Sequence, residues 1–133
     1  VMINEGITNV GWDAFSGCSS LKSITIPESV TSIGSDAFYE CSSLESITIP
    51  EGVTSIRYGT FSGCSSLKSI TIPESVTDIE NYALSGCSSL INADIPAGVI
   101  EIENSVFYGC SNLESINVDE NNKYYISEKR NII

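Results

Sequence analysis

Residues 18–31 read CSSLKSITIPESVT, and the same letters recur without change at residues 64–77. The chain of 133 residues contains five cysteines, and each lies 23 residues after the one before it. A fixed period of roughly 20 to 50 residues is typical of a protein built from stacked repeats. The sequence therefore predicts a solenoid, in which each coil of the chain packs on the next. The cysteines that mark the period are Cys18, Cys41, Cys64, Cys87 and Cys110.

The residues of one repeat predict a short strand followed by turns. Ile24-Thr25-Ile26 alternates apolar and polar residues, which is typical of a strand with one buried face. Pro27 cannot donate a hydrogen bond to a neighbouring strand, so we expect the strand to end there. Residues 35–38 (SDAF) are expected to form one brief helical or 3-10 turn, because Ser or Asp can cap it. The glycine before most cysteines is expected to adopt a left-handed conformation, with Glu40 in that place in one copy.

The repeat resembles the 23-residue unit of the BspA-like leucine-rich repeat family. The resemblance covers residues 1 to about 118 and implies a right-handed leucine-rich-repeat solenoid of the α/β horseshoe type. In such a fold each coil places one short strand on the concave face, with short helical turns and loops elsewhere. The resemblance also implies a secreted or bacterial cell-surface protein with a role in adhesion or protein binding. The matching positions are Leu21-x-x-Ile24-x-Ile26-Pro27-x-x-Val30-x-x-Ile33 and then Ala37-Phe38-x-x-Cys41-x-x-Leu44.

The period divides the chain into an array and an extension. Residues 1–118 hold about five coils, of which the N-terminal one is partial, and residues 119–133 form an incomplete C-terminal extension. The array starts within a repeat at Val1, whereas solenoid ends normally carry a polar capping unit. We therefore expect the chain to be a fragment of a longer secreted protein.

The charge of the chain argues against several classes of partner. The formal net charge is −11, with 6 basic residues against 17 acidic ones. Nucleic acids and anionic membranes are bound through basic side chains, so neither is an expected partner. The sequence has no long apolar run, so we expect no membrane insertion. The excess of acidic residues is expected to keep the array soluble and monomeric.

Catalytic chemistry finds little support in the residue types. The chain contains no histidine, which removes the most common general base and every histidine-assisted nucleophile. Its glycines are single and periodic, so the sequence contains no glycine-rich phosphate loop. Carboxylate pairs such as Glu101 and Glu103 exist, but nothing in the pattern encloses them. We expect a non-enzymatic protein without catalytic residues and without a cofactor.

The polar residues of the predicted strands form the first candidate site. They alternate with buried residues, so they should align in rows on the concave face. We interpret this face and an acidic rim as a binding surface for an extracellular protein, such as a host matrix or surface protein. The alternative is that serine and threonine simply suit an exposed strand. The face comprises Ser23, Thr25, Ser46, Thr48, Ser69, Thr71, Asn92 and Asp94, and the rim comprises Glu5, Glu28, Glu51, Glu74 and Glu120, interrupted by Ala97.

Aromatic residues on the non-concave side form an alternative site. Trp12 and Tyr58 share one repeat position, and Tyr82 lies one position later. Exposed rings there could stack on a glycan or anchor a protein partner, whereas partial burial against the next coil is the structural alternative. A third hypothesis is a purely structural spacer, which holds another domain away from a cell surface.

The five cysteines are expected to form a ladder of buried, reduced thiols. Each would lie about 5 Å from the next, at the spacing of adjacent strands. Disulfides or a metal ion are the alternatives, but the number of cysteines is odd and a straight row lacks the tetrahedral arrangement that zinc requires. We therefore predict no metal site, and calcium between neighbouring carboxylates of the acidic rim is the alternative to a solvated edge.

Overall fold

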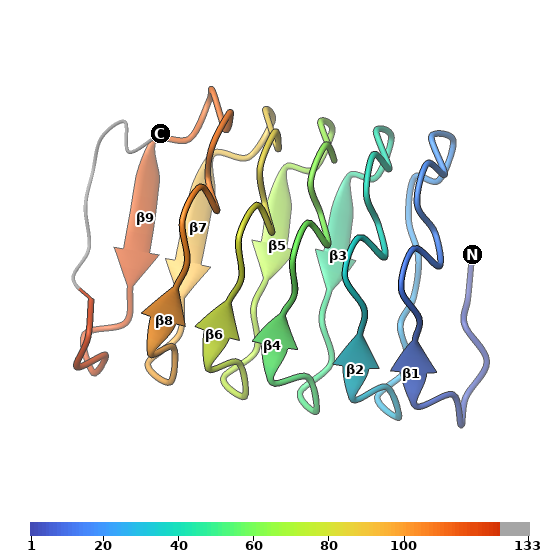
Figure 1. The fold of residues 1–133 in the computed structure, drawn as a ribbon, viewed down its shortest axis with the longest axis horizontal. Helices are drawn as coiled ribbons and strands as arrows, with labels where there is room; N and C mark the ends of the chain where they lie inside the picture. Colours follow the sequence, from blue (N-terminus) through green and yellow to red (C-terminus); the bar gives the residue numbers. More distant parts are fainter. Residues whose placement is uncertain (126–133) are drawn as a thin grey trace.

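The computed structural model describes residues 1–125, which form a β-solenoid of about five turns (Figure 1). Each coil between residues 41 and 109 adds a strand to each of two columns, and the coils follow one another along the long axis of the molecule. Paired strands are parallel, and paired residues differ by 23 in number, as Ser46 does from Ser69. The prediction of a leucine-rich-repeat solenoid is confirmed.

The first strand column is the one that the alternation of residues predicted. An isolated parallel bridge between Met2 and Thr25 occupies the corresponding place in the first coils. Strand β7 ends at Ile95, directly before Pro96, as expected for a residue that cannot donate to a ladder. The column consists of β3 (Ser46–Thr48), β5 (Ser69–Thr71), β7 (Asn92–Ile95) and β9 (Ser115–Val118).

A second strand column follows the first within each coil, whereas the alternation in the sequence predicts only one strand per coil. These strands are two residues long, so each carries a single core-facing side chain and shows no alternation along the sequence. Their register is nevertheless the same as in the first column, with Ile56 beside Ile79. The column consists of β1 (Asn9–Val10), β2 (Ser32–Ile33), β4 (Ser55–Ile56), β6 (Asp78–Ile79) and β8 (Glu101–Ile102).

The third side of each coil is a run of hydrogen-bonded turns, where the sequence had predicted a short helical turn. Alternate N–H groups donate to the carbonyl three residues back, as Ala37 donates to Gly34 at 3.2 Å. The groups between them donate to the next coil, as Phe38 donates to Thr60 at 2.9 Å. A helix needs successive N–H groups to donate within the same segment, so residues 1–125 contain no helix.

Two left-handed backbone positions, four residues apart, recur in each coil and also prevent a helix. The one before the cysteine was predicted, and it includes Glu40, with a φ angle of 57°. The other was not predicted, because its residue type changes from coil to coil. It is occupied by Asp13, Asp36, Gly59, Tyr82 and Ser105, with φ angles of 56–62°.

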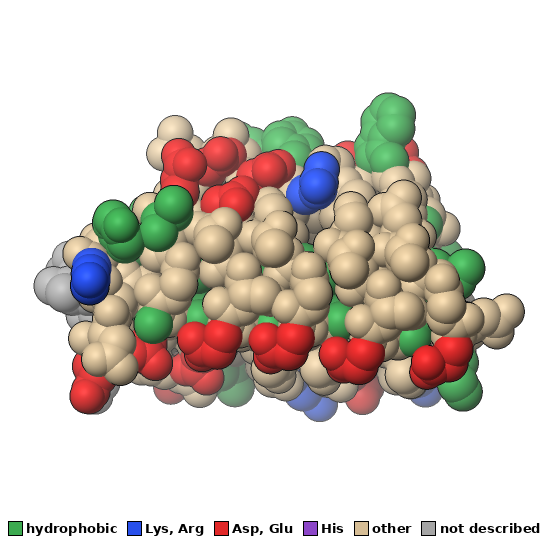
Figure 2. All heavy atoms as spheres, turned by 90° about the horizontal axis from the view of Figure 1, so that it is seen from below, with side chains coloured by type: hydrophobic (Ala, Val, Ile, Leu, Met, Phe, Trp, Pro, Cys, Tyr) green, Lys and Arg blue, Asp and Glu red, His purple; other side chains and the backbone are tan. Residues whose placement is uncertain are grey.

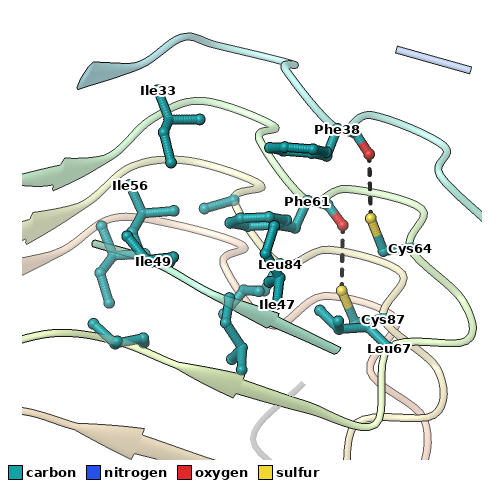
Figure 3. Close-up of a cluster of buried hydrophobic side chains, with 14 of the residues drawn as sticks. Ile33, Phe38, Ile47, Ile49, Ile56, Phe61, Cys64, Leu67, Leu84 and Cys87 are labelled. Atoms are coloured by element: carbon teal, nitrogen blue, oxygen red, sulfur yellow. Dashed lines mark hydrogen bonds between the residues drawn. The ribbon is translucent and has the colours of Figure 1, made fainter. Parts of the chain in front are cut away.

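The core is a continuous stack of side chains enclosed by the two strand columns and the turns (Figure 3). The rings of Phe15, Phe38 and Phe61 lie almost parallel, with centroids 5.3 and 5.5 Å apart. Leu84 takes the same position in the next coil and is fully buried. Thr60 replaces an alanine in this core, and its hydroxyl donates to a backbone carbonyl of its own turn at 2.8 Å. Each coil therefore completes the core of its neighbours.

Asn122 continues the repeat beyond the last strand. It lies 23 residues after Val99, takes the position of that valine and is buried. Its Nδ2 donates to the carbonyls of Pro96 and Val99, both at 3.0 Å. Its Oδ1 accepts hydrogen bonds from the N–H groups of Tyr124 and Tyr125, at 2.7 and 2.9 Å. A fully hydrogen-bonded polar side chain thus covers the C-terminal end of the described core.

The division of the chain into an array, residues 1–118, and an extension, residues 119–133, stays a prediction. Residues 126–133 of that extension lie outside the described residues. Over the part that is described, the structure has no helix with the length and apolar character needed to cross a membrane.

Candidate functional sites

The Ser/Thr face is the outward side of the first strand column. The alternation along β3 buries Ile47 and exposes both of its neighbours, and the other coils repeat this pattern. The parallel register places Thr48 beside Thr71, so side chains of one kind form rows. All eight residues predicted for this face are exposed, and they are Ser23, Thr25, Ser46, Thr48, Ser69, Thr71, Asn92 and Asp94.

The C-terminal end of the Ser/Thr face is hydrogen-bonded within itself. The Ser115 hydroxyl donates to Asn92 Oδ1 at 2.5 Å, and Asn117 Nδ2 donates to Asp94 Oδ1 at 3.1 Å. These cross-strand pairs hold four polar side chains in place along β7 and β9. The face therefore changes from rows of hydroxyl groups to an amide and carboxylate surface near its end.

The acidic rim runs beside the Ser/Thr face, at the turn that follows each strand of the first column. Its glutamates recur every 23 residues and are exposed, and Figure 2 shows acidic side chains spaced along this edge. Where Ala97 interrupts the rim, a recess of about 270 Å³ lies between Glu74, Asp94 and Asp119. The face and the rim therefore meet at this recess. Residues 1–125 contain no group of His, Cys, Asp or Glu side chains arranged to hold a metal ion.

A second acidic group, which was not predicted from the sequence, lies on the second strand column. Two of its carboxylates bind the backbone of the preceding coil. Glu80 accepts a hydrogen bond from the Tyr58 N–H, and Glu103 accepts one from the Asn81 N–H, both at 3.0 Å. These glutamates connect neighbouring coils, which gives them a structural role. The group also includes Asp78 and Glu101, which are register partners in β6 and β8.

The three residues predicted for the aromatic site have two different positions: two of them line a hollow, and the third contacts one of these two. Trp12, which is 73% exposed, and Tyr58 line an open hollow of about 570 Å³. Tyr82 does not line this hollow, but its ring meets that of Tyr58 edge to face, with centroids 5.8 Å apart. Trp12 is thus largely exposed, whereas Tyr58 and Tyr82 are each about half-buried and contact each other across adjacent coils. Partial burial against the next coil therefore stays the structural alternative for Tyr58 and Tyr82.

Charged and hydroxyl side chains that were not predicted as site residues complete the lining of the hollow. Ser35 lies between Trp12 and Tyr58 in the same repeat position, and Asp36 and Arg57 lie beside it. Burial raises the pKa of Asp36, repulsion from Asp13 acts in the same direction, and a hydrogen bond from Trp12 opposes both. The sequence does contain a signal for this hollow, since the small Ser35 stands between the large Trp12 and Tyr58 at one repeat position.

Four of the five cysteines form the predicted ladder of buried, unpaired thiols. Cys41, Cys64, Cys87 and Cys110 are buried, whereas Cys18 is exposed, so the prediction was wrong for Cys18. Each buried thiol donates to a carbonyl of the preceding coil, at 3.1–3.3 Å, and two of these bonds are drawn in Figure 3. Burial raises the pKa of these thiols, to about 12 for Cys64 and to about 11 for Cys110.

Several solved structures are similar to this chain. A leucine-rich cell surface protein from Faecalibacterium prausnitzii shares 38% identity over 90% of this chain, with a TM-score of 0.87. A leucine-rich repeat protein from Bacteroides ovatus shares 41% identity over 83% of this chain, with a TM-score of 0.80. The leucine-rich repeat protein of T. pallidum shares 36% identity over 87%, with a TM-score of 0.83. The present chain spans 31%, 28% and 56% of these three proteins respectively.

A comparison with curated proteins found no match. The family description that matches is the BspA type leucine rich repeat region, over residues 31–129 and in six copies. Proteins with such repeats are generally non-enzymatic binding or structural modules. The repeat period, the stacked parallel coils and this match agree, and the chain belongs to the BspA-type leucine-rich-repeat family.

Proposed function

We propose that the chain is a protein-binding module of a bacterial surface or secreted protein, and that it binds its partner through the Ser/Thr face and the acidic rim. The observation that supports this most is the register of the first strand column. Thr48 and Thr71 are paired in register and both are exposed, so the face presents repeated hydroxyl groups on a rigid backbone. Solenoids typically use such extended regular surfaces for binding.

The chemistry of the face and the rim favours a partner with basic side chains. Serine and threonine hydroxyls both donate and accept hydrogen bonds, so they suit a polar protein surface. The rim adds exposed carboxylates, among them Glu28, Glu51 and Glu74. Complementary charge accelerates association and selects the partner, and its effect is weakened by salt. Because the coils repeat one pattern, each contact is expected to be weak and the whole to be multivalent.

The cellular location in this proposal is the bacterial surface or the extracellular space. One similar protein is described as a leucine rich cell surface protein, and the chain belongs to the same repeat family. The chain spans less than a third of that protein.

The test is binding to a panel of immobilised extracellular-matrix proteins, measured by surface plasmon resonance at low and high salt. We expect binding that weakens as salt rises and that is lost when Thr25, Thr48 and Thr71 are all changed to lysine. The lysines would place positive charge and bulk in the centre of the face, where a basic partner would be repelled.

The matched control changes Thr31, Thr54 and Thr77 to lysine. These threonines are also exposed and also recur every 23 residues, but they lie just before the second strand column. The change in net charge is the same, so the control variant should keep its binding. Equal loss in both variants would assign the effect to net charge and would reject the Ser/Thr face. Absence of binding to every protein in the panel would favour the structural spacer.

A further inference from the structure

The hollow beside Trp12 has the size and the composition of a small-molecule site. Its volume of about 570 Å³ lies within the range of roughly 300–1,000 Å³ that is usual for ligand pockets. Aromatic rings, hydroxyl groups and one charged group of each sign line it. The lining includes Trp12, Ser35, Asp36, Arg57 and Tyr58.

We propose that this hollow binds a neutral oligosaccharide, with a sugar ring held between Trp12 and Tyr58. These two residues share a repeat position two coils apart, which corresponds to about 10 Å at the spacing of adjacent strands. Ser35 occupies the coil between them, and its small side chain leaves a slot. Sugar rings present flat C–H surfaces, and exposed aromatic rings with a fixed orientation are suited to cover them.

The Tyr58 wall of the slot is supported by its neighbours before a ligand enters. At the other wall Trp12 lies beside Asp36, close enough for its side chain to lower the pKa of that carboxyl. Tyr58 contacts the edge of Tyr82, and its N–H donates to Glu80 at 3.0 Å. A pre-organised site loses less conformational entropy on binding than one whose side chains are free.

The charged residues of the hollow can bind sugar hydroxyls. The carboxylate of Asp36 lies over the backbone of Gly59, where even a Cβ atom would overlap it. The carboxylate of Asp36 supplies an acceptor at the edge of the hollow, and the guanidinium of Arg57 supplies several donors. Adjacent hydroxyls of a sugar both donate and accept, so one acceptor and one donor group are a suitable pair.

The surrounding charge selects a neutral sugar over an anionic one. Asp13 lies close enough to Asp36 to raise its pKa, and Glu80 lies at the backbone of Tyr58. The whole chain carries a net charge of −11. A sulfated or sialylated glycan would be repelled by these carboxylates, whereas a chain of neutral hexoses or N-acetylhexosamines would not. An open hollow also allows such a chain to continue in both directions.

The chain supplies its own probe for the experiment, because Trp12 is its single tryptophan. We would titrate the protein with a set of neutral oligosaccharides and with a sulfated one, and follow the fluorescence of Trp12. At least one neutral oligosaccharide should change the emission in a saturable way, and the sulfated one should not. Tyr58→Ala should weaken the affinity about tenfold or more, since it removes one wall of the slot.

A second variant distinguishes binding that is lost because the hollow is filled from binding that is lost because the chain is unfolded. Ser35→Tyr keeps both aromatic walls but fills the slot, so it should abolish the fluorescence change. Tyr108→Ala, which removes an exposed ring several coils away, should leave the affinity unchanged. Circular dichroism would establish that each variant is folded. The lysine variant of the Ser/Thr face should also keep its sugar binding, because the two sites are separate.

The proposal would be overturned if no neutral oligosaccharide binds at millimolar concentration. It would also be overturned if calorimetry detects sugar binding that survives both Trp12→Ala and Ser35→Tyr. Preference for the sulfated oligosaccharide would reject the neutral ligand. None of these three results would bear on protein binding by the Ser/Thr face.

Discussion

The buried thiols show how one residue type serves both the core and the hydrogen bonding of the solenoid. The Cys64 side chain is fully buried, and its Sγ–H donates to the carbonyl of Phe38 at 3.2 Å. Free cysteine behaves as a small apolar residue with a weak donor, so it fills the core and still satisfies a carbonyl. Its raised pKa keeps it in the unreactive thiol form at neutral pH.

We predict that one thiol per folded chain reacts rapidly with a thiol-specific chromogenic reagent at pH 8. Cys18 is exposed, whereas the other four are buried and carry raised pKa values. Cys18→Ser should remove the rapid phase, and all five thiols of the unmodified chain should react in denaturant. Rapid reaction of two or more thiols in the folded chain would show that the ladder is accessible.

Glu40 is the residue at which a substitution should stabilise the fold. Its φ angle of 57° is left-handed, and the equivalent residues in the other coils are glycines. A left-handed conformation costs a non-glycine residue roughly 1–2 kcal/mol, which exceeds the additional entropy that glycine loses on folding. We predict that Glu40→Gly raises the free energy of unfolding by about 0.5–1 kcal/mol in chemical denaturation.

The control for this variant is Glu45→Gly, at an exposed position where the backbone is not left-handed. It should lower the free energy of unfolding by about 0.5–1 kcal/mol. If Glu40→Gly destabilises the chain as well, contacts of the Glu40 side chain must outweigh the backbone strain.

At the scale of the elements, the strands and turns are stable only as stacks. A strand such as β4 is two residues long and has no independent stability. Its hydrogen bonds, and half of those made by each run of turns, go to neighbouring coils. In the last part of the described chain, the side chain of Asn122 makes such bonds between segments, because its Nδ2 donates to the carbonyls of Pro96 and Val99.

We predict that Asn122→Ala lowers the free energy of unfolding by about 2–3 kcal/mol, since four backbone groups would each lose a hydrogen bond with this buried side chain. Those groups are the carbonyls of Pro96 and Val99 and the N–H groups of Tyr124 and Tyr125. Asn121→Ala, at the exposed neighbouring position, should change the value by less than about 0.5 kcal/mol. Equal effects of the two variants in denaturant titrations would contradict a capping role for Asn122.

At the scale of the whole molecule, the thiol ladder couples stability to alkaline pH. The unperturbed thiol pKa is 9.0, and burial raises it to about 12 in folded Cys64. Between these values the unfolded chain loses its proton before the folded chain does, so the folded chain holds more protons. The stability that this thiol contributes is therefore complete below pH 9 and declines as the pH rises above it.

We predict a loss of stability on the order of 1 kcal/mol per pH unit for each deeply buried thiol above pH 9. The measurement is the denaturant midpoint at pH 7 and at pH 10, for the native chain and for a variant with Cys64→Ala and Cys87→Ala. The variant should be less stable at pH 7 but should lose less on going to pH 10. An identical decline in both would assign the alkaline effect to other groups, such as the tyrosines.

The repeat period was enough to predict the solenoid, its core and the exposure of Thr25, because alternation and spacing are local properties of the chain. It did not predict the second strand column, since strands such as β2 are too short to leave a pattern. Nor did it predict the turns, because alternate N–H groups there bond to a neighbouring coil rather than along the chain.

The two candidate sites also differ in whether the sequence alone predicts them. The Ser/Thr face follows from the sequence, since it is one side of an alternating strand. The hollow does not, because its walls come from three coils and its shape depends on the small Ser35 lying between Trp12 and Tyr58. Residues that share a repeat position are brought side by side only when the coils stack, and that packing determines which of them enclose a space.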